Sequence, residues 1–157
     1  MKGLILFLKA AILLAASGIV ALGGVGLLWL PANPFNPEYS GLLYTIIAGL
    51  YASAACLLVS LFHGFRFLNS IERSAMVSER SLKAVKAVRN AVIAAGVVHA
   101  VLLPFIFLLA ERDDAPGLIL VGTAPVLAAA VIAAFTGVVH GLFGNALAMQ
   151  GKAGSLR

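Results

Sequence analysis

The sequence predicts an all-α polytopic membrane protein, a four-helix bundle built as two transmembrane hairpins that a cytoplasmic helical connection joins. Hydrophobic residues make up 62% of the 157 residues and charged residues 11%, and the mean hydropathy is +1.06. Soluble domains carry about 25% charged residues, so this chain has too few charges to cover a water-soluble surface. Four apolar runs, at about 4–30, 41–65, 91–110 and 118–147, each suit a transmembrane helix of roughly 20 residues. We expect residues 1–157 to form a single membrane domain.

The first run, residues 4–30, predicts an uncleaved transmembrane helix rather than a secretory signal peptide. Its apolar core is longer than the roughly 7–15 residues of a signal-peptide core. At 1.5 Å per residue it spans about 40 Å, against a hydrocarbon core of about 30 Å. We therefore expect the helix to tilt, or Lys9 to extend its amine to the interface. Trp29 marks the far interface, and the three prolines within 31–37 end the helix.

The second and fourth runs each carry a stripe of small residues with a period of four. Such a stripe allows two helix backbones to approach closely in lipid and predicts self-association as a homo-oligomer. The alternative is that an alanine-rich composition produces the stripes by chance. The candidate packing residues are Ala48, Ala52, Cys56, Ser60 and Gly64 in the second run and Ala129, Ala133, Gly137 and Gly141 in the fourth. Cys56 is the single cysteine, which excludes an internal disulfide.

The segment 66–90 contains six basic and two acidic residues and has a net charge of +4. Ser78 is a candidate N-cap, and Glu79 follows at the positive end of the helix dipole. Apolar and charged residues then alternate with helical spacing, which predicts a basic amphipathic helix that leads into the third run. We expect the second helix to continue past the membrane and the chain to bend at 75–78. The residues expected to contact a protein partner or anionic lipid are Arg73, Arg80, Lys83, Lys86 and Arg89.

The third run contains Pro104, which we expect to kink the helix or to free a carbonyl group. An acidic turn at 111–117 follows. Asp113 or Asp114 is expected to cap the fourth helix, and Pro116 is tolerated in a first turn. The carboxylates of this turn are also candidate ligands of a divalent cation, but helix capping explains them more simply.

Lysine and arginine lie almost wholly on one side of the predicted membrane. That side holds the N-terminus, the segment 66–90 and the C-terminal tail, whereas the two opposite loops contain Glu38 and the net-negative acidic turn. The positive-inside rule assigns the basic side to the cytoplasm, so we expect both termini there. Because the charges follow a topology rule, the net charge of +5 does not indicate direct nucleic-acid binding.

Three histidines, His63, His99 and His140, lie within or at the edge of the predicted spans. Two facing histidines would suit a haem, and three would suit a metal or proton site. However, no carboxylate shares their depth in any span, so a hydrogen-bonded structural role for His99 is the simpler interpretation. We expect no cofactor and no metal, and a b-type haem protein is the least favoured function.

The sequence predicts no enzyme, because it has no glycine-rich phosphate loop, no Ser/His/Asp arrangement and no HExxH motif. The leading hypothesis is a protein that acts through interaction with the bilayer and with a cytosolic partner. The alternative is a homo-oligomeric transport protein for an ion or small molecule. The polar residues available to line its path are Ser53, Ser60, His99, Thr123 and Thr136.

Two stretches resemble a family of small bacterial four-span membrane proteins of unknown function. They are the serine-led basic helix at 77–86 and the turn formed by Asp113, Asp114, Ala115, Pro116 and Gly117. The resemblance covers about residues 40–150, and the chain departs from the pattern in its short tail after Ala148 and in Val77, where the family usually has phenylalanine. Family members are often encoded beside small helix-turn-helix regulators. The resemblance therefore implies a bacterial inner-membrane protein that acts as a membrane partner or sensor for a cytosolic regulatory protein.

Overall fold

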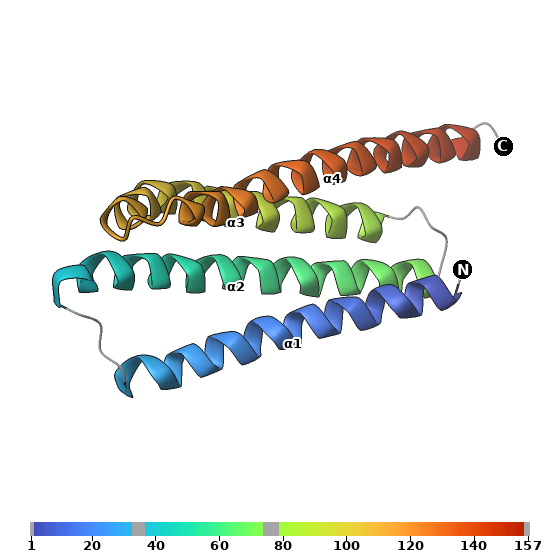
Figure 1. Ribbon diagram of the computed structural model, residues 1–157. Helices are drawn as coiled ribbons and strands as arrows, with labels where there is room; N and C mark the ends of the chain where they lie inside the picture. The colour runs from blue at the N-terminus through green and yellow to red at the C-terminus, as the bar shows by residue number, and fades with distance from the viewer. Residues whose placement is uncertain (1, 33–36, 74–78, 156–157) are drawn as a thin grey trace.

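The computed structural model describes residues 2–32, 37–73 and 79–155. These residues form four long α-helices and no strand, which confirms the predicted all-α fold. The helices are α1 (Lys2–Ala32), α2 (Pro37–Arg73), α3 (Glu79–Arg112) and α4 (Gly117–Ser155) (Figure 1). Each one is long and apolar enough to cross a membrane.

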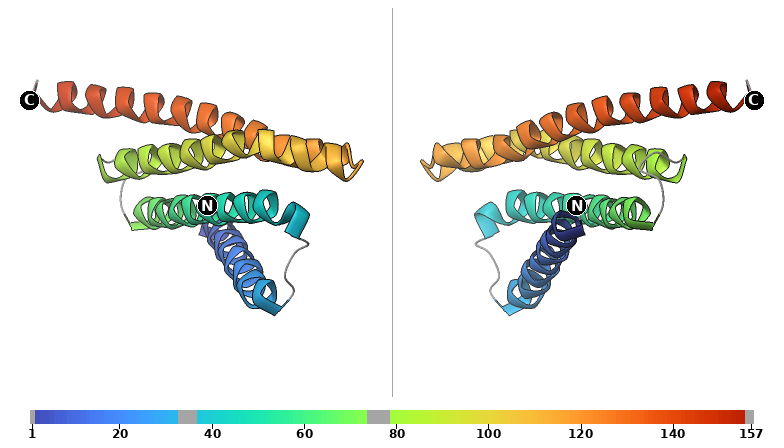
Figure 2. Two further views of the ribbon diagram at one scale, coloured as in Figure 1. Left: turned by 90° about the vertical axis from the view of Figure 1, so that its left-hand side faces the viewer. Right: turned by 90° about the vertical axis from the view of Figure 1, so that its right-hand side faces the viewer.

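The four helices pack in the order in which they occur along the chain, and neighbours are antiparallel (Figure 1). Among the described residues, α1 packs against α2, and α2 and α3 pack together along their lengths. Helix α4 packs mainly against α3 and also meets α2 through the rings of Phe143 and Phe67. In views turned by 90° from the first, α2, α3 and α4 form a stack, and α1 leaves this stack at an angle (Figure 2). We call the end at which α2 ends and α3 begins the basic end, and the opposite end, at which α3 ends and α4 begins, the acidic-turn end (Figure 1).

The charged segment is not a separate element, because it continues two of the long helices. The second helix extends beyond residue 65 as far as Arg73, and α3 begins at Glu79 and runs without interruption into the third apolar run. This confirms the predicted continuation of the second helix and the helix that leads into the third run. The candidate cap Ser78 and the bend at 75–78 lie outside the described residues. At 1.5 Å per residue, the 37 residues of α2 and the 34 of α3 extend about 55 and 51 Å.

Helix α3 supplies most of the buried side chains, in a single stripe along its length. Buried positions recur every three or four residues, which is the spacing of one helix face. The largest cluster lies towards the acidic-turn end, where Ile46 of α2 packs against Leu102, Ile106 and Leu109. The buried residues of α3 are Ser81, Val85, Val92, Ala95, Gly96, His99, Leu102, Ile106, Leu109 and Ala110. Helix α3 therefore joins α2 to α4.

Two glycines permit the close approach of α3 to its neighbours. A Cβ atom added to Gly49 of α2 would lie 2.5 Å from a methyl carbon of Leu102. A Cβ atom added to Gly96 of α3 would lie 2.8 Å from the Cβ atom of Ala129 in α4. Both distances are shorter than ordinary van der Waals contact, so the helix spacing depends on the missing side chains.

The acidic turn ends α3 rather than beginning α4, and the prediction that Asp113 or Asp114 caps the fourth helix is wrong. Asp114 has a φ of 51°, which is the left-handed conformation that commonly follows a helix. The amide of Ala115 donates to the carbonyl of Ala110 at 2.9 Å, which closes the last turn of α3 in a Schellman arrangement. Among the described residues, no hydrogen bond joins either carboxylate to α4. Helices α3 and α4 continue through their interior prolines, Pro104 and Pro125, and α1 includes Pro31 just before its end.

Helix α1 is attached to α2 by a small number of polar contacts. The Tyr51 hydroxyl donates to the carbonyl of Gly23 at 2.7 Å, across the mid-part of the two helices. Towards the basic end, the amine of Lys9 pairs with the carboxylate of Glu72 and lies 5.8 Å from the centroid of the Phe65 ring. Lys9 therefore meets a carboxylate near the end of α2, and its position at the membrane interface stays a prediction.

Candidate functional site

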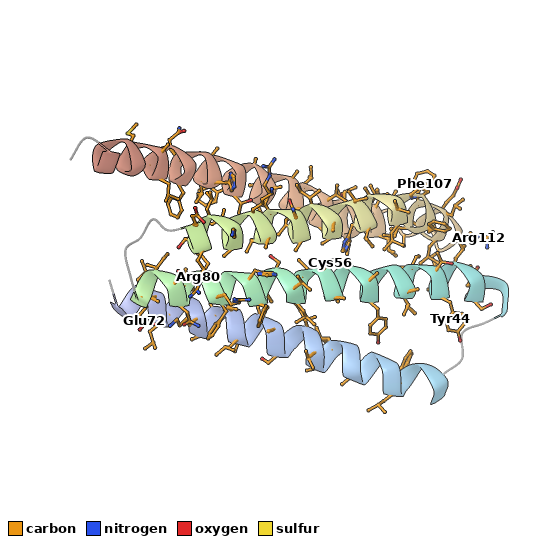
Figure 3. All side chains as sticks on the ribbon, turned by 180° about the vertical axis from the view of Figure 1, so that it is seen from behind. Tyr44, Cys56, Glu72, Arg80, Phe107 and Arg112 are labelled. Atoms are coloured by element: carbon orange, nitrogen blue, oxygen red, sulfur yellow. The ribbon has the colours of Figure 1, made fainter. Side chains whose placement is uncertain are left out.

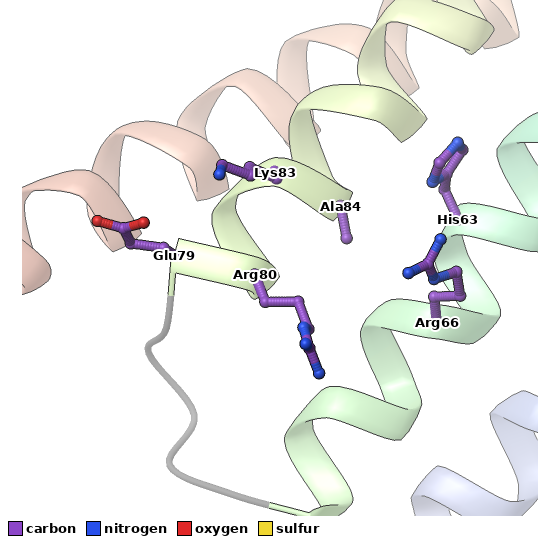
Figure 4. A pocket seen from close by; sticks show the side chains of 6 residues that line it. All are labelled: His63, Arg66, Glu79, Arg80, Lys83 and Ala84. Carbon is purple, nitrogen blue, oxygen red and sulfur yellow. The ribbon is translucent and has the colours of Figure 1, made fainter.

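A cleft of about 450 Å³ lies between α2 and α3 at the basic end (Figure 4). His63 and Arg66 lie three residues apart and Arg80 and Ala84 lie four apart, so within each pair the side chains share a helix face. This feature is hereafter called the basic cleft. Its lining residues are His63 and Arg66 from α2 and Glu79, Arg80, Lys83 and Ala84 from α3.

The two helices are held together beside the basic cleft by a small buried layer. Ser81 has no exposed surface, and its hydroxyl lies 3.3 Å from the hydroxyl of Ser70 across the interface. Val85 and Leu68 are also buried. A layer of this kind fixes the distance between the walls, because a serine pair allows a closer approach than two large apolar side chains.

The arginines of the two walls extend towards the space between the helices. Arg80 projects from α3 and Arg66 from α2, with the His63 ring close to Arg66, whereas Glu79 and Lys83 point away (Figure 4). The guanidinium of Arg66 also lies 5.8 Å from the centroid of the Phe62 ring, within the range of a cation–π contact. Within 2–32, 37–73 and 79–155, neither arginine has a carboxylate partner. The basic cleft therefore carries positive charge that no acidic side chain of the described chain neutralises.

The other predicted basic residues surround this cleft. Lys83, Lys86 and Arg89 are exposed on α3, and the side chain of Arg73 lies outside those described. A Cβ atom added to Gly137 of α4 would lie 3.6 Å from the guanidinium carbon of Arg89. Arg89 thus extends over α4 from the same helix that carries the exposed Lys83 and Lys86 (Figure 3 shows all described side chains).

The small-residue stripes serve contacts within the chain at several positions. In α4, Ala129 faces Gly96 and Gly137 faces Arg89, while Gly141 has open space around it. In α2, Ser60 is buried and a Cβ atom added to Gly64 would lie 3.7 Å from Ile12 of α1. The residues that remain half-buried or exposed are Ala48, Ala52, Cys56 and Ala133. Self-association stays a prediction that rests on the exposed members.

The structure separates the three histidines. His63 lines the basic cleft, and His140 lies half-buried on α4. His99 is 8% exposed, and its Nδ1 lies 3.1 Å from the carbonyl oxygen of Ala95 in the same helix. It also lines a largely apolar groove of about 520 Å³ beside Tyr51 and Pro125. In the part of the chain that is described, no three His, Cys, Asp or Glu side chains gather as a metal site would require.

Four of the five polar residues named for a transport path, Ser53, His99, Thr123 and Thr136, lie within hydrogen-bond distance of carbonyl groups of their own helices. The hydroxyls of Ser53, Thr123 and Thr136 donate to the carbonyls of Leu50, Leu120 and Ile132. These hydrogen bonds satisfy the hydroxyls without joining the residues into a common path. No observation on these side chains favours transport.

The sequence did not single out Arg66 or Ser81 as site residues, and it indicated His63 only as a candidate for a haem, metal or proton site. His63 and Arg66 lie three positions apart, so a helix places them on one face, but the predicted boundary at residue 65 separated them. Ser81 gives no signal in the sequence, since a serine between charged residues is usually exposed. Its burial depends on the register between α2 and α3.

A family model described as "Protein of unknown function (DUF2975)" matches residues 28–152 of the chain. An uncharacterized membrane protein of Bacillus subtilis (strain 168), YoaS, is 29% identical to the chain over 150 residues, which cover 94% of this chain and 93% of the relative. No solved structure matches the chain. The family match includes α2, α3 and most of α4, and therefore all the residues that line the basic cleft.

Proposed function

The chain belongs to the DUF2975 family of proteins of unknown function, and from this premise we propose that it is a non-enzymatic inner-membrane protein that binds an acidic cytosolic protein at its basic end. Its relative YoaS is a membrane protein by name, and the four apolar helices fit the same location. The resemblance described above favours a regulatory protein as the partner. We place both termini and the basic end in the cytoplasm, following the positive-inside rule.

The observation that carries this proposal is the length of the α2–α3 pair. The two helices extend about 55 and 51 Å, whereas a hydrocarbon core is about 30 Å thick. About 20 Å of each helix is thus available outside the core. At the basic end the pair is packed through Ser81 and Val85, so it presents its charges from a rigid support.

The surface offered to the partner consists of exposed lysines and arginines on α3 with Arg66 of α2 beside them. Positive potential on such a surface accelerates encounter with an acidic partner and selects against basic ones. Because these side chains are exposed, we expect the association to weaken as salt concentration rises and the Debye length falls below about 8 Å. The surface comprises Arg66, Arg80, Lys83, Lys86 and Arg89.

The test is co-purification from the native host in mild detergent, with the Lys83→Glu/Lys86→Glu variant compared with wild type. Each replacement removes one positive charge and adds one negative, so the net charge of 66–90 falls from +4 to zero. We expect the cytosolic partner to be lost while the protein still inserts. A C-terminal reporter checks the orientation, and Lys83→Gln/Lys86→Gln is a milder variant that keeps that segment net positive.

Two controls separate docking from general charge effects. Lys83→Arg/Lys86→Arg keeps the charge and should retain the partner, and Arg112→Glu changes the charge at the opposite end and should also retain it. If the glutamate and glutamine variants insert in the original orientation and still retain the partner, the docking proposal is wrong.

A further inference from the structure

We propose that the basic cleft is a binding site for a phosphate group, held between Arg66 of α2 and Arg80 of α3. This inference goes beyond the docking of a protein partner, since it concerns a small anionic ligand inside the cleft rather than the surface around it. The ligand class is a phosphate monoester or diester, supplied either by an anionic lipid headgroup or by a soluble phosphate compound.

Each wall of the basic cleft carries an arginine, whose guanidinium group suits a phosphate. A guanidinium is planar and offers two parallel N–H donors that match two phosphate oxygens, which an ammonium cannot do. Arg66 and Arg80 extend towards the same space from different helices (Figure 4). One phosphate bound there would contact both helices at once.

Arg66 and Arg80 have no acidic counterpart in the cleft among the described residues. Glu79 is the single acidic residue of its lining, and its side chain points away from both arginines (Figure 4). The next carboxylate of the described chain at this end, Glu72, pairs with Lys9 of α1. Two like charges that face one cleft repel each other, and an anion between them converts that repulsion into attraction.

The basic cleft is large enough for a small ligand. The volume of about 450 Å³ falls within the roughly 300–1,000 Å³ of typical small-ligand sites. Ala84 contributes to the α3 wall, and its short side chain leaves the cleft open between the two arginines. The buried Ser81 and Val85 hold the walls apart at a fixed distance, so the site exists before the ligand arrives.

The basic cleft lies at the depth of the membrane surface that the predicted spans imply. His63 lies within the last turn of the predicted span 41–65, and Arg66 is the first charged residue after it. The cleft therefore lies where lipid phosphates lie, and basic pockets between helices on the cytoplasmic side bind lipid headgroups in this way. The same opening is also accessible from the cytosol, so the experiment must distinguish the two sources.

The test uses the full chain purified in an uncharged maltoside detergent, with thermal unfolding measured against increasing concentrations of two probes. One probe is dihexanoyl phosphatidylglycerol, and the other is inorganic phosphate, with chloride at equal ionic strength as the reference. Binding to the folded state raises the unfolding temperature, because it stabilises that state by RT ln(1 + [L]/Kd). A response to the lipid alone assigns the phosphate to a headgroup, and a response to inorganic phosphate assigns it to a soluble ligand.

Four variants locate the site. Arg66→Gln and Arg80→Gln each remove charge-assisted hydrogen bonds and should weaken binding about tenfold or more. Ala84→Leu keeps every charge, fills the cleft and should abolish binding even if an arginine variant fails to fold. Lys86→Gln removes an exposed cation that does not line the cleft and should bind as wild type does.

A second control, Ala94→Leu, adds the same bulk at an exposed position of α3 and should also leave binding unchanged. The proposal is overturned if neither probe shifts the unfolding temperature of the wild type, or if Ala84→Leu binds with unchanged affinity. It is also overturned if Lys86→Gln loses as much affinity as the arginine variants, because the response would then report diffuse charge.

Discussion

The contact between Gly96 of α3 and Ala129 of α4 allows a quantitative test of the packing. A Cβ atom added to Gly96 would lie 2.8 Å from the Cβ atom of Ala129, about 0.6–1.2 Å less than the 3.4–4 Å of ordinary contact. Both atoms are bonded directly to their backbones, so no side-chain rotation relieves the overlap. Gly96→Ala must therefore move the two helices apart.

Two terms of opposite sign determine the effect of Gly96→Ala on the free energy of unfolding. Overpacking a tight interface costs about 1–3 kcal/mol, whereas alanine exceeds glycine in helix propensity by about 1 kcal/mol. The expected net result is a destabilisation of about 0–2 kcal/mol. In an Ala129→Gly background the overlap is absent, and Gly96→Ala should stabilise the protein by about 1 kcal/mol.

The coupling energy of this double-mutant cycle removes the propensity term, because that term occurs in both backgrounds. We expect a coupling of about 1–3 kcal/mol, within the range measured for residues in contact. The assay is reversible unfolding in mixed micelles with increasing sodium dodecyl sulfate. Gly144→Ala is the matched control, since no atom lies within 4 Å of its added Cβ atom. Equal effects of Gly96→Ala in both backgrounds would refute the close approach of α3 and α4.

Two further predictions concern the acidic turn and the attachment of α1. Asp114 has a φ of 51°, so Asp114→Gly should stabilise the protein by about 0.5–1 kcal/mol in the same assay. Asp113 has no positive φ, so Asp113→Gly should not stabilise the protein. Equal effects of the two substitutions would contradict the described ending of α3. Tyr51→Phe removes the hydrogen bond to Gly23 and should cost about 0.6 kcal/mol, the average for hydrogen bonds between membrane helices, and it should increase proteolysis of α1 in detergent. An unchanged stability and proteolysis rate would contradict the described contact.

The fold class and the continuity of the helices were predictable because they depend on composition and local periodicity. The apolar runs are long, and the alternation of charged and apolar residues after Glu79 has the period of a helix. The structure confirms that this helix continues into the third run. The role of Asp114 was not predictable in the same way, because an aspartate suits both the start of a helix and the left-handed residue after one.

The candidate site was only half predictable from the sequence. Arg80 and Lys83 follow from the basic pattern of α3, but the contribution of His63 and Arg66 depends on how α2 pairs with α3. That register is determined by contacts such as Ser70 with Ser81, which no local pattern indicates. The small-residue stripes are ambiguous for a related reason: Ala129 packs within the chain, and periodicity alone does not distinguish internal contacts from contacts between copies.

The packing of helices in chain order has a consequence for biosynthesis. Each helix packs mainly on the one synthesised just before it, and α2 and α4 meet through the rings of Phe67 and Phe143. Contacts between sequence neighbours close short loops, which favours rapid folding. Each helix can therefore dock on its predecessor as it enters the bilayer, and the basic cleft is complete once α3 has paired with α2, before α4 has been made.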